Sequence, residues 1–190
     1  MKKTAGFLKF FATLAIILLV LALVACVLGE GVLLTSGDLS SLQGSVEGFI
    51  TINSTEEIPF TVAQLNELKP ALLFAVAFAA IILLLSLLSM IKIRKVLGEC
   101  KEETPFSEVS CRNLKGAARL EIIAGIIGII ATIVSTFLLR LDVTINGKTL
   151  TDTTINLNLS FIFTAVFLYL LYHVAQYGKS LENGSPEKYE

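Results

Sequence analysis

Motifs that mark an enzyme are missing from this sequence of 190 residues. It has no glycine-rich phosphate-binding loop, no nucleophile beside a base and no group of residues with metal-ligand spacing. These absences argue against catalysis. We therefore expect that the protein is not an enzyme and has no catalytic residues, no bound metal and no cofactor.

Cysteine is also scarce, with three residues in the chain. Cys100 and Cys111 lie in a basic segment between two hydrophobic runs, and Cys26 stands alone in the first run. Their spacing fits neither a disulfide framework nor a zinc site. Covalent cross-links are therefore not expected to stabilise the fold.

Charged residues are few, and long hydrophobic runs take their place. Hydrophobic residues make up 54% of the chain and charged residues 16%, which is too apolar for an ordinary soluble domain. Four runs have about the 20 residues that a helix needs to cross a bilayer, namely 7–28, 71–91, 117–139 and 159–177. We predict an all-α membrane protein, a single domain over residues 1–190 built as a bundle of four transmembrane helices in the lipid bilayer.

The positive charges are distributed unevenly among the segments between these runs. All but three of the fifteen lysine and arginine residues lie near the termini or between the second and third runs; the exceptions are Lys69, Arg140 and Lys148. Because cytoplasmic loops carry the excess of positive charge, this pattern places both termini and the linker 92–116 in the cytoplasm. Residues 29–70 and 140–158 then form outer loops.

The N-terminal run allows two interpretations. Its basic start and the sequence Leu23-Val24-Ala25-Cys26 resemble a bacterial lipoprotein signal that is cleaved before an acylated cysteine. The apolar run is, however, longer than the hydrophobic part of a usual signal and long enough to span a membrane. The sequence alone does not decide whether Cys26 is cleaved and acylated.

The outer loops carry β-strand signals. Residues 46–53 have β-branched and aromatic residues in rough alternation, and 143–150 place Asn146-Gly147 between two β-prone runs, which is typical of a hairpin. A lone hairpin is marginal in water, so we predict a small β-cap on the outer side, made from the hairpin and the strand at 46–53. A short helix is also expected from Thr61 to Leu68, separated by Pro70 from the second span.

The cytoplasmic linker indicates a turn followed by a helix. Residues 99–106 are charged and contain Pro105, and Ser107 is a candidate N-cap. Residues 106–119 are then predicted to form a helix that leads into the third span. Its apolar residues make an approximate stripe along one face. We expect this amphipathic helix to lie against the membrane surface or the inner end of the bundle.

Two segments carry a resemblance to a known family. Residues 105–123, PFSEVSCRNLKGAARLEII, and the tail that begins Gly178-Lys-Ser-Leu181 resemble a bacterial four-helix membrane family catalogued as domain of unknown function 2975. The resemblance implies a multi-pass protein of the bacterial inner membrane. Members are often encoded beside a small helix-turn-helix regulator, which suggests membrane-linked regulation.

Several small or polar residues lie inside the predicted spans. Ala124, Gly128, Thr132 and Thr136 recur every four residues and predict a face for close helix packing. Ser86 and Ser89 in the second span are expected to bond to carbonyl groups of their own helix.

Ionisable residues at membrane depth are candidates for function. Glu121 and His173 lie about one turn inside the cytoplasmic ends of the third and fourth spans, and Tyr169 and Gln176 share the face of His173. They predict either a site that responds to protons or to a ligand, or a hydrogen-bonded clamp between helices. Arg119 and Lys115 are alternative partners for Glu121.

We interpret the chain as a protein that acts through contacts rather than chemistry. A helix-turn-helix regulator or another cytoplasmic protein would dock on the linker; the candidate docking residues are Phe106, Arg112, Lys115 and Arg119. Direct nucleic-acid binding is not expected. The alternative is a small transporter or channel, which four helices can form only as a homo-oligomer.

Overall fold

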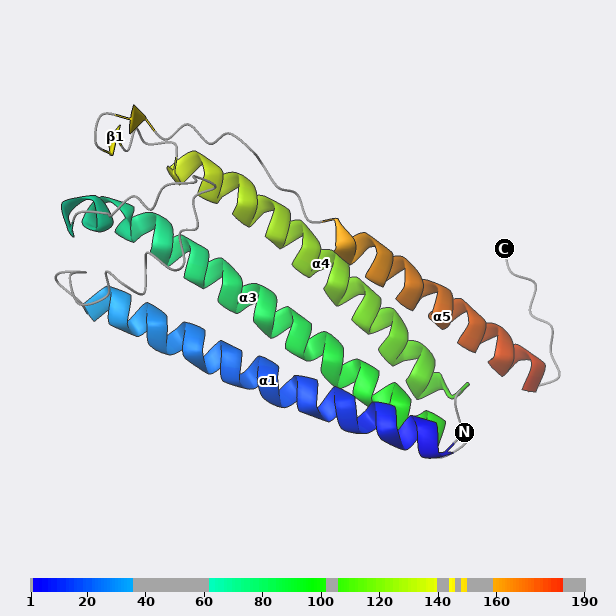
Figure 1. The fold of residues 1–190 in the computed structure, drawn as a ribbon. Helices are drawn as coiled ribbons and strands as arrows, with labels where there is room; N and C mark the ends of the chain where they lie inside the picture. The colour runs from blue at the N-terminus through cyan, green and yellow to red at the C-terminus, as the bar shows by residue number, and fades with distance from the viewer. Residues whose placement is uncertain are drawn as a thin grey trace. The chain divides into compact units, whose positions relative to one another are not determined.

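Four long helices dominate the computed structural model, which describes residues 2–35, 62–101, 106–139, 144–145, 148–149 and 159–182. They are α1 (Lys2–Thr35), α3 (Val62–Lys101), α4 (Glu108–Leu139) and α5 (Ser160–Glu182) (Figure 1). Each contains a segment long and apolar enough to cross a membrane. The prediction of four membrane-spanning helices is therefore confirmed by length and composition.

The helices extend beyond the predicted spans. Helix α3 continues through the basic residues after Ile91 to Lys101, and α4 starts at Glu108, so most of the predicted linker 92–116 is helical. The prediction of a turn was wrong for Glu99 to Lys101. Lysine, arginine, leucine and glutamate are good helix formers, and no proline lies between Pro70 and Pro105.

Pro70 does not separate two helices as predicted, because α3 is continuous from Val62 and contains Pro70. Proline removes one hydrogen bond and usually kinks or breaks a helix interior. Pro70 and the neighbouring Lys69 lie where the long apolar run begins. Water can hydrate a freed carbonyl group there, which the middle of a span would not allow.

A short antiparallel strand pair lies in the connection between α4 and α5 (Figure 1). Strands β1 (Thr144–Ile145) and β2 (Lys148–Thr149) pair Thr144 with Thr149 and Ile145 with Lys148. This register leaves two residues between the strands, as the predicted hairpin requires. The predicted strand at 46–53 lies outside the described residues, and the β-cap remains a prediction.

The chain divides into two compact units. Unit 1 comprises Met1–Val24, Ile81–Gly128 and Asn158–Glu190, and unit 2 comprises Ala25–Ala80 and Ile129–Leu157. Unit 1 thus holds the first part of α1, the second part of α3, the first part of α4 and all of α5.

The core of unit 1 forms between α3, α4 and α5. Its buried residues come from the first turns of α4 and from α5; they are Cys111, Leu114, Ala117, Ala118, Leu168 and Ala175. Ile93 and Val96 of α3 pack against this cluster. Small side chains predominate on α4, which lets its backbone approach the neighbouring helices closely. The predicted helix at 106–119 therefore packs in the helix bundle.

Glycines of α4 accept side chains from neighbouring helices. The ring of Phe161, at the start of α5, occupies the space that a side chain on Gly125 would need. A Cβ atom on Gly128 would lie 3.8 Å from Ile82 of α3, and Ala124 is buried. The prediction that small residues form a packing face is confirmed for the part of this stripe in unit 1.

Ser89 does not bond to its own helix as predicted. Its side chain is 1% exposed, and its hydroxyl oxygen has no hydrogen-bond partner. Ser89 shares a face of α3 with Ile93 and Val96, which pack against the core. We infer that the small size of Ser89 serves close packing at this face.

In unit 2, two contacts join side chains to other groups of the same helix. Phe74 and Phe78 of α3 stack with ring centroids 6.4 Å apart, and the hydroxyl of Thr35 donates to the carbonyl of Gly31 at 2.8 Å. Both are local interactions between residues one turn apart. They position side chains on a helix without fixing one helix against another.

Candidate functional site at the α3–α4 connection

The start of α4 is fixed by a serine cap. The backbone N–H of Ser110 donates to the Ser107 hydroxyl oxygen at 3.1 Å, and the N–H of Cys111 donates to the Ser107 carbonyl at 3.1 Å. The first bond satisfies an N–H that no helix carbonyl can reach, which is the role of an N-cap. The predicted N-cap is therefore confirmed.

The same serine connects α4 to the end of α3. Its hydroxyl donates to Glu99 Oε2 at 2.8 Å and lies 3.2 Å from the hydroxyl of Ser110. A hydrogen bond to a carboxylate is shorter and stronger than one between neutral groups. One side chain therefore links the end of one helix to the first turn of the next.

The end of α5 packs against the start of α4. A Cβ atom on Gly178 would lie 2.5 Å from the ring of Phe106, so the ring occupies the space above this glycine. Lys179 Nζ lies 3.8 Å from Glu108 Oε2, but the two side chains are 39% and 86% exposed. Solvent screens such a pair, so the contact of Phe106 with Gly178 contributes more to holding these helix ends.

The first turns of α4 have a buried face and an exposed face. Ser110, Asn113 and the core residues of α4 are buried, whereas Val109, Arg112 and Arg119 are exposed. These three exposed residues are spaced by three and seven positions, which places them on one side of the helix. Glu108 is also exposed and lies one turn before Arg112 on the same side. A helix that is held on one side presents this stripe as a preformed surface.

The four predicted docking residues fall into two groups. Arg112 and Arg119 are exposed on the stripe. Phe106 is 37% exposed, with its ring over Gly178, and Lys115 Nζ lies 5.4 Å from the ring centroid of Tyr172 on α5. Phe106 and Lys115 thus make contacts within the protein, which the sequence did not indicate.

The predicted polar residues of the spans are not gathered into one site. Glu121 is half-buried and His173 is exposed, and no hydrogen bond or ion pair joins them among the described residues. The ring of His173 lies 5.1 Å from that of Tyr172, which packs edge to face with Tyr169 at 6.5 Å. Gln176 is half-buried beside these residues on α5.

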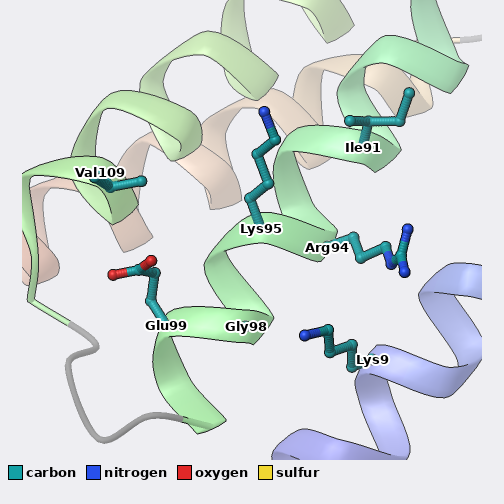
Figure 2. A pocket seen from close by; sticks show the side chains of 7 residues that line it. All are labelled: Lys9, Ile91, Arg94, Lys95, Gly98, Glu99 and Val109. Carbon is teal, nitrogen blue, oxygen red and sulfur yellow. The ribbon is translucent and has the colours of Figure 1, made fainter.

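A cavity of about 320 Å³ lies in unit 1 beside the end of α3. Its walls come from three helices and are lined by Lys9, Ile91, Arg94, Lys95, Gly98, Glu99 and Val109 (Figure 2). Arg94 and Lys9 lie on the side of α3 that faces α1, while the Glu99 carboxylate points toward the start of α4 (Figure 2). Sequence reasoning used these cations to orient the chain and did not group them into a site. It had no signal that would bring Lys9 next to residues more than 80 positions away.

Metal-binding geometry is not found in the described part of the chain, where no three histidine, cysteine, aspartate or glutamate residues gather closely enough to hold an ion. Cys26, Cys100 and Cys111 are free thiols.

Comparisons with known proteins identify no relative. No protein-family model, curated protein or solved structure matches this chain.

Proposed function

We propose that the protein is a multi-pass protein of the bacterial inner membrane that acts by binding a cytoplasmic protein and not by catalysis. The observation that carries this proposal is the stripe of Val109, Arg112 and Arg119 on α4, exposed on a helix whose opposite face is buried. A rigid surface loses little conformational entropy when a partner binds.

The orientation in this proposal follows from charge. The start of α1, the end of α3, the start of α4 and the end of α5 carry most of the lysine and arginine residues. The positive-inside rule places these segments in the cytoplasm. On the outer side, β1 and β2 would pair with residues 46–53 to form the β-cap.

The chemistry of the stripe favours an acidic partner. Arg112 and Arg119 are seven residues apart, about 10 Å along the helix axis. Guanidinium groups form bidentate hydrogen bonds with carboxylates, so two acidic side chains on the partner would match them. By resemblance to the family of domain of unknown function 2975, a small helix-turn-helix regulator is the partner class that we propose.

A transporter or channel remains the alternative, and the geometry supports it less. Transport needs polar residues that line a path near the middle of the membrane. Glu121 and His173 lie near one end of their spans and are not joined. We therefore favour a contact surface over a transport path.

The test is a pull-down of full-length protein from membranes of its source, with bound proteins identified by mass spectrometry. We expect recovery of an acidic cytoplasmic protein to fall about tenfold when Arg112→Glu and Arg119→Glu are combined, because attraction becomes repulsion. The matched control combines Lys9→Glu and Arg94→Glu, which makes the same change in charge elsewhere in unit 1. Equal recovery with both pairs of substitutions would contradict docking on α4.

A further inference from the structure

The cavity beside the end of α3 has an excess of positive charge. Lys9, Arg94 and Lys95 line it, and Glu99 is the single acidic residue in its wall. Among the described residues, no ion pair joins these three cations to a carboxylate. Glu99 instead accepts the hydroxyl hydrogen of Ser107 at 2.8 Å. Cations that share a cavity repel one another, and a bound anion removes this repulsion.

The shape of the cavity depends on a missing side chain. Lys9 Nζ lies 3.4 Å from the position that a Cβ atom on Gly98 would take. The ammonium group of α1 therefore reaches the surface of α3 where α3 has no side chain (Figure 2). An alanine would fit in ordinary contact, but a larger residue would fill the space and displace Lys9.

The wall residues favour a phosphate group. Arg94 offers a planar fork of N–H donors that matches two phosphate oxygens, and Lys9 adds a compact positive charge on the same side of α3. A volume of about 320 Å³ accommodates a phosphate with the polar group attached to it.

The apolar surroundings favour a lipid as the source of that phosphate. Ile91 and Val109 are in the wall, and α1 and α3 continue from the cavity into segments apolar enough to cross a membrane. Large apolar side chains of α1 next to Lys9 are exposed, among them Phe10 and Phe11. Acyl chains can lie along such a surface while the headgroup reaches the cations.

We propose that this cavity binds the phosphate headgroup of an anionic phospholipid, with Lys9 and Arg94 as the phosphate-binding residues and Gly98 as the residue that leaves room for it. The cavity shares Val109 with the stripe on α4, but Arg112 and Arg119 do not line it, so the two sites use different cations. It adds a lipid ligand to the proposed function and does not depend on it.

Native mass spectrometry of the full-length protein in a non-ionic detergent tests the site. The probes are phosphatidylglycerol, which is anionic, phosphatidylcholine, which is zwitterionic, and inorganic phosphate. We expect wild-type protein to bind phosphatidylglycerol at least about tenfold more tightly than phosphatidylcholine. Combined Lys9→Gln and Arg94→Gln substitutions should remove this preference.

Three further variants distinguish lipid binding in the cavity from a general attraction between anionic lipid and positive charge on the protein. Gly98→Leu keeps every charge and should weaken phosphatidylglycerol binding about tenfold by filling the space, whereas Gly98→Ala should change it less than about twofold. Arg112→Gln with Arg119→Gln removes the same amount of charge outside the cavity and should leave lipid binding unchanged. The proposal is overturned if this control pair weakens binding as much as the cavity pair does, or if Gly98→Leu has no effect.

Competition by inorganic phosphate distinguishes the two sources of the ligand. If millimolar inorganic phosphate displaces phosphatidylglycerol and also binds on its own, the cavity binds anions but its ligand is free phosphate from solution. This result would overturn the lipid assignment. If it does not compete, the acyl chains contribute to binding and the lipid assignment is supported. The pull-down proposed above tests Arg112 and Arg119, whereas lipid binding tests Lys9, Arg94 and Gly98. Failure of one experiment therefore does not imply failure of the other.

Discussion

Helices α1 and α4 differ in how much of their surface the protein covers. Among the described side chains of α1, Ala12 and Leu33 are buried, and the large apolar residues are mostly exposed. The described part of α4 buries seven residues, most of them in its first eleven positions: Ser110, Cys111, Asn113, Leu114, Ala117, Ala118 and Ala124. Protein contacts therefore cover one side of the start of α4, whereas they leave most of the described part of α1 exposed.

The glycines show the same contrast. Side chains added at Gly6, Gly29 or Gly31 of α1 would meet no atom within 4 Å, whereas one at Gly125 of α4 would collide with Phe161. Both helices are long and apolar enough to cross a membrane, but the exposed α1 is the longer and more apolar of the two. The helix that the protein covers less is therefore also the one with the higher hydropathy.

The largest expected effect comes from filling a glycine contact of α4. Gly125→Ala should destabilise the protein by about 1–3 kcal/mol, because the new methyl group displaces the Phe161 ring from a packed interface. The measurement is unfolding by SDS in mixed micelles. Gly6→Ala on α1 is the matched control and should be neutral or slightly stabilising, since it meets open space.

A second variant checks the cause of that loss. In a Phe161→Ala background the cost of Gly125→Ala should largely disappear, since the ring that collides is gone. If Gly125→Ala costs the same unfolding free energy with and without the Phe161 ring, the collision with this ring is not the cause of the loss. The difference between α4 and α1 would then not be one of side-chain packing.

A smaller effect is expected at the start of α4. Ser107→Ala removes the N-cap and the hydrogen bond to Glu99, and should cost about 1 kcal/mol of unfolding free energy in the same assay. Ser107→Asn should recover most of the loss, because asparagine also caps helices. If asparagine is no better than alanine, the cap does not determine stability here.

The smallest effect concerns the contact between Lys115 and Tyr172. Lys115→Met should cost about 0.5–1 kcal/mol, because it removes a cation that lies 5.4 Å from the ring centroid but keeps the length of the side chain. A double-mutant cycle with Tyr172→Leu measures the coupling. Additive losses would show that the two residues do not stabilise each other.

Much of the fold was predictable because its cause is local. A run of about 20 apolar residues predicts a span, Ser107 before a helical segment predicts an N-cap, and Asn146-Gly147 predicts the pairing of β1 with β2. Each pattern acts over a few neighbouring residues. The structure agrees with all three.

The candidate site was less predictable because its contacts join distant segments. No local pattern predicted that Phe106 contacts Gly178 of α5 or that Lys115 lies near Tyr172 of α5. Gly125 lies next to the predicted packing stripe, yet no local pattern identifies Phe161 as its partner. Lys9 carried no signal beyond its charge, and the cavity becomes visible only when α1 is placed beside α3.

The double role of Ser107 couples two helix ends. One hydroxyl group bonds to Glu99 on α3 while it caps α4, so a single substitution would loosen the first turn of α4 and its link to α3 together. Arg112 is five residues further along α4, so the position of the arginine surface depends on both contacts.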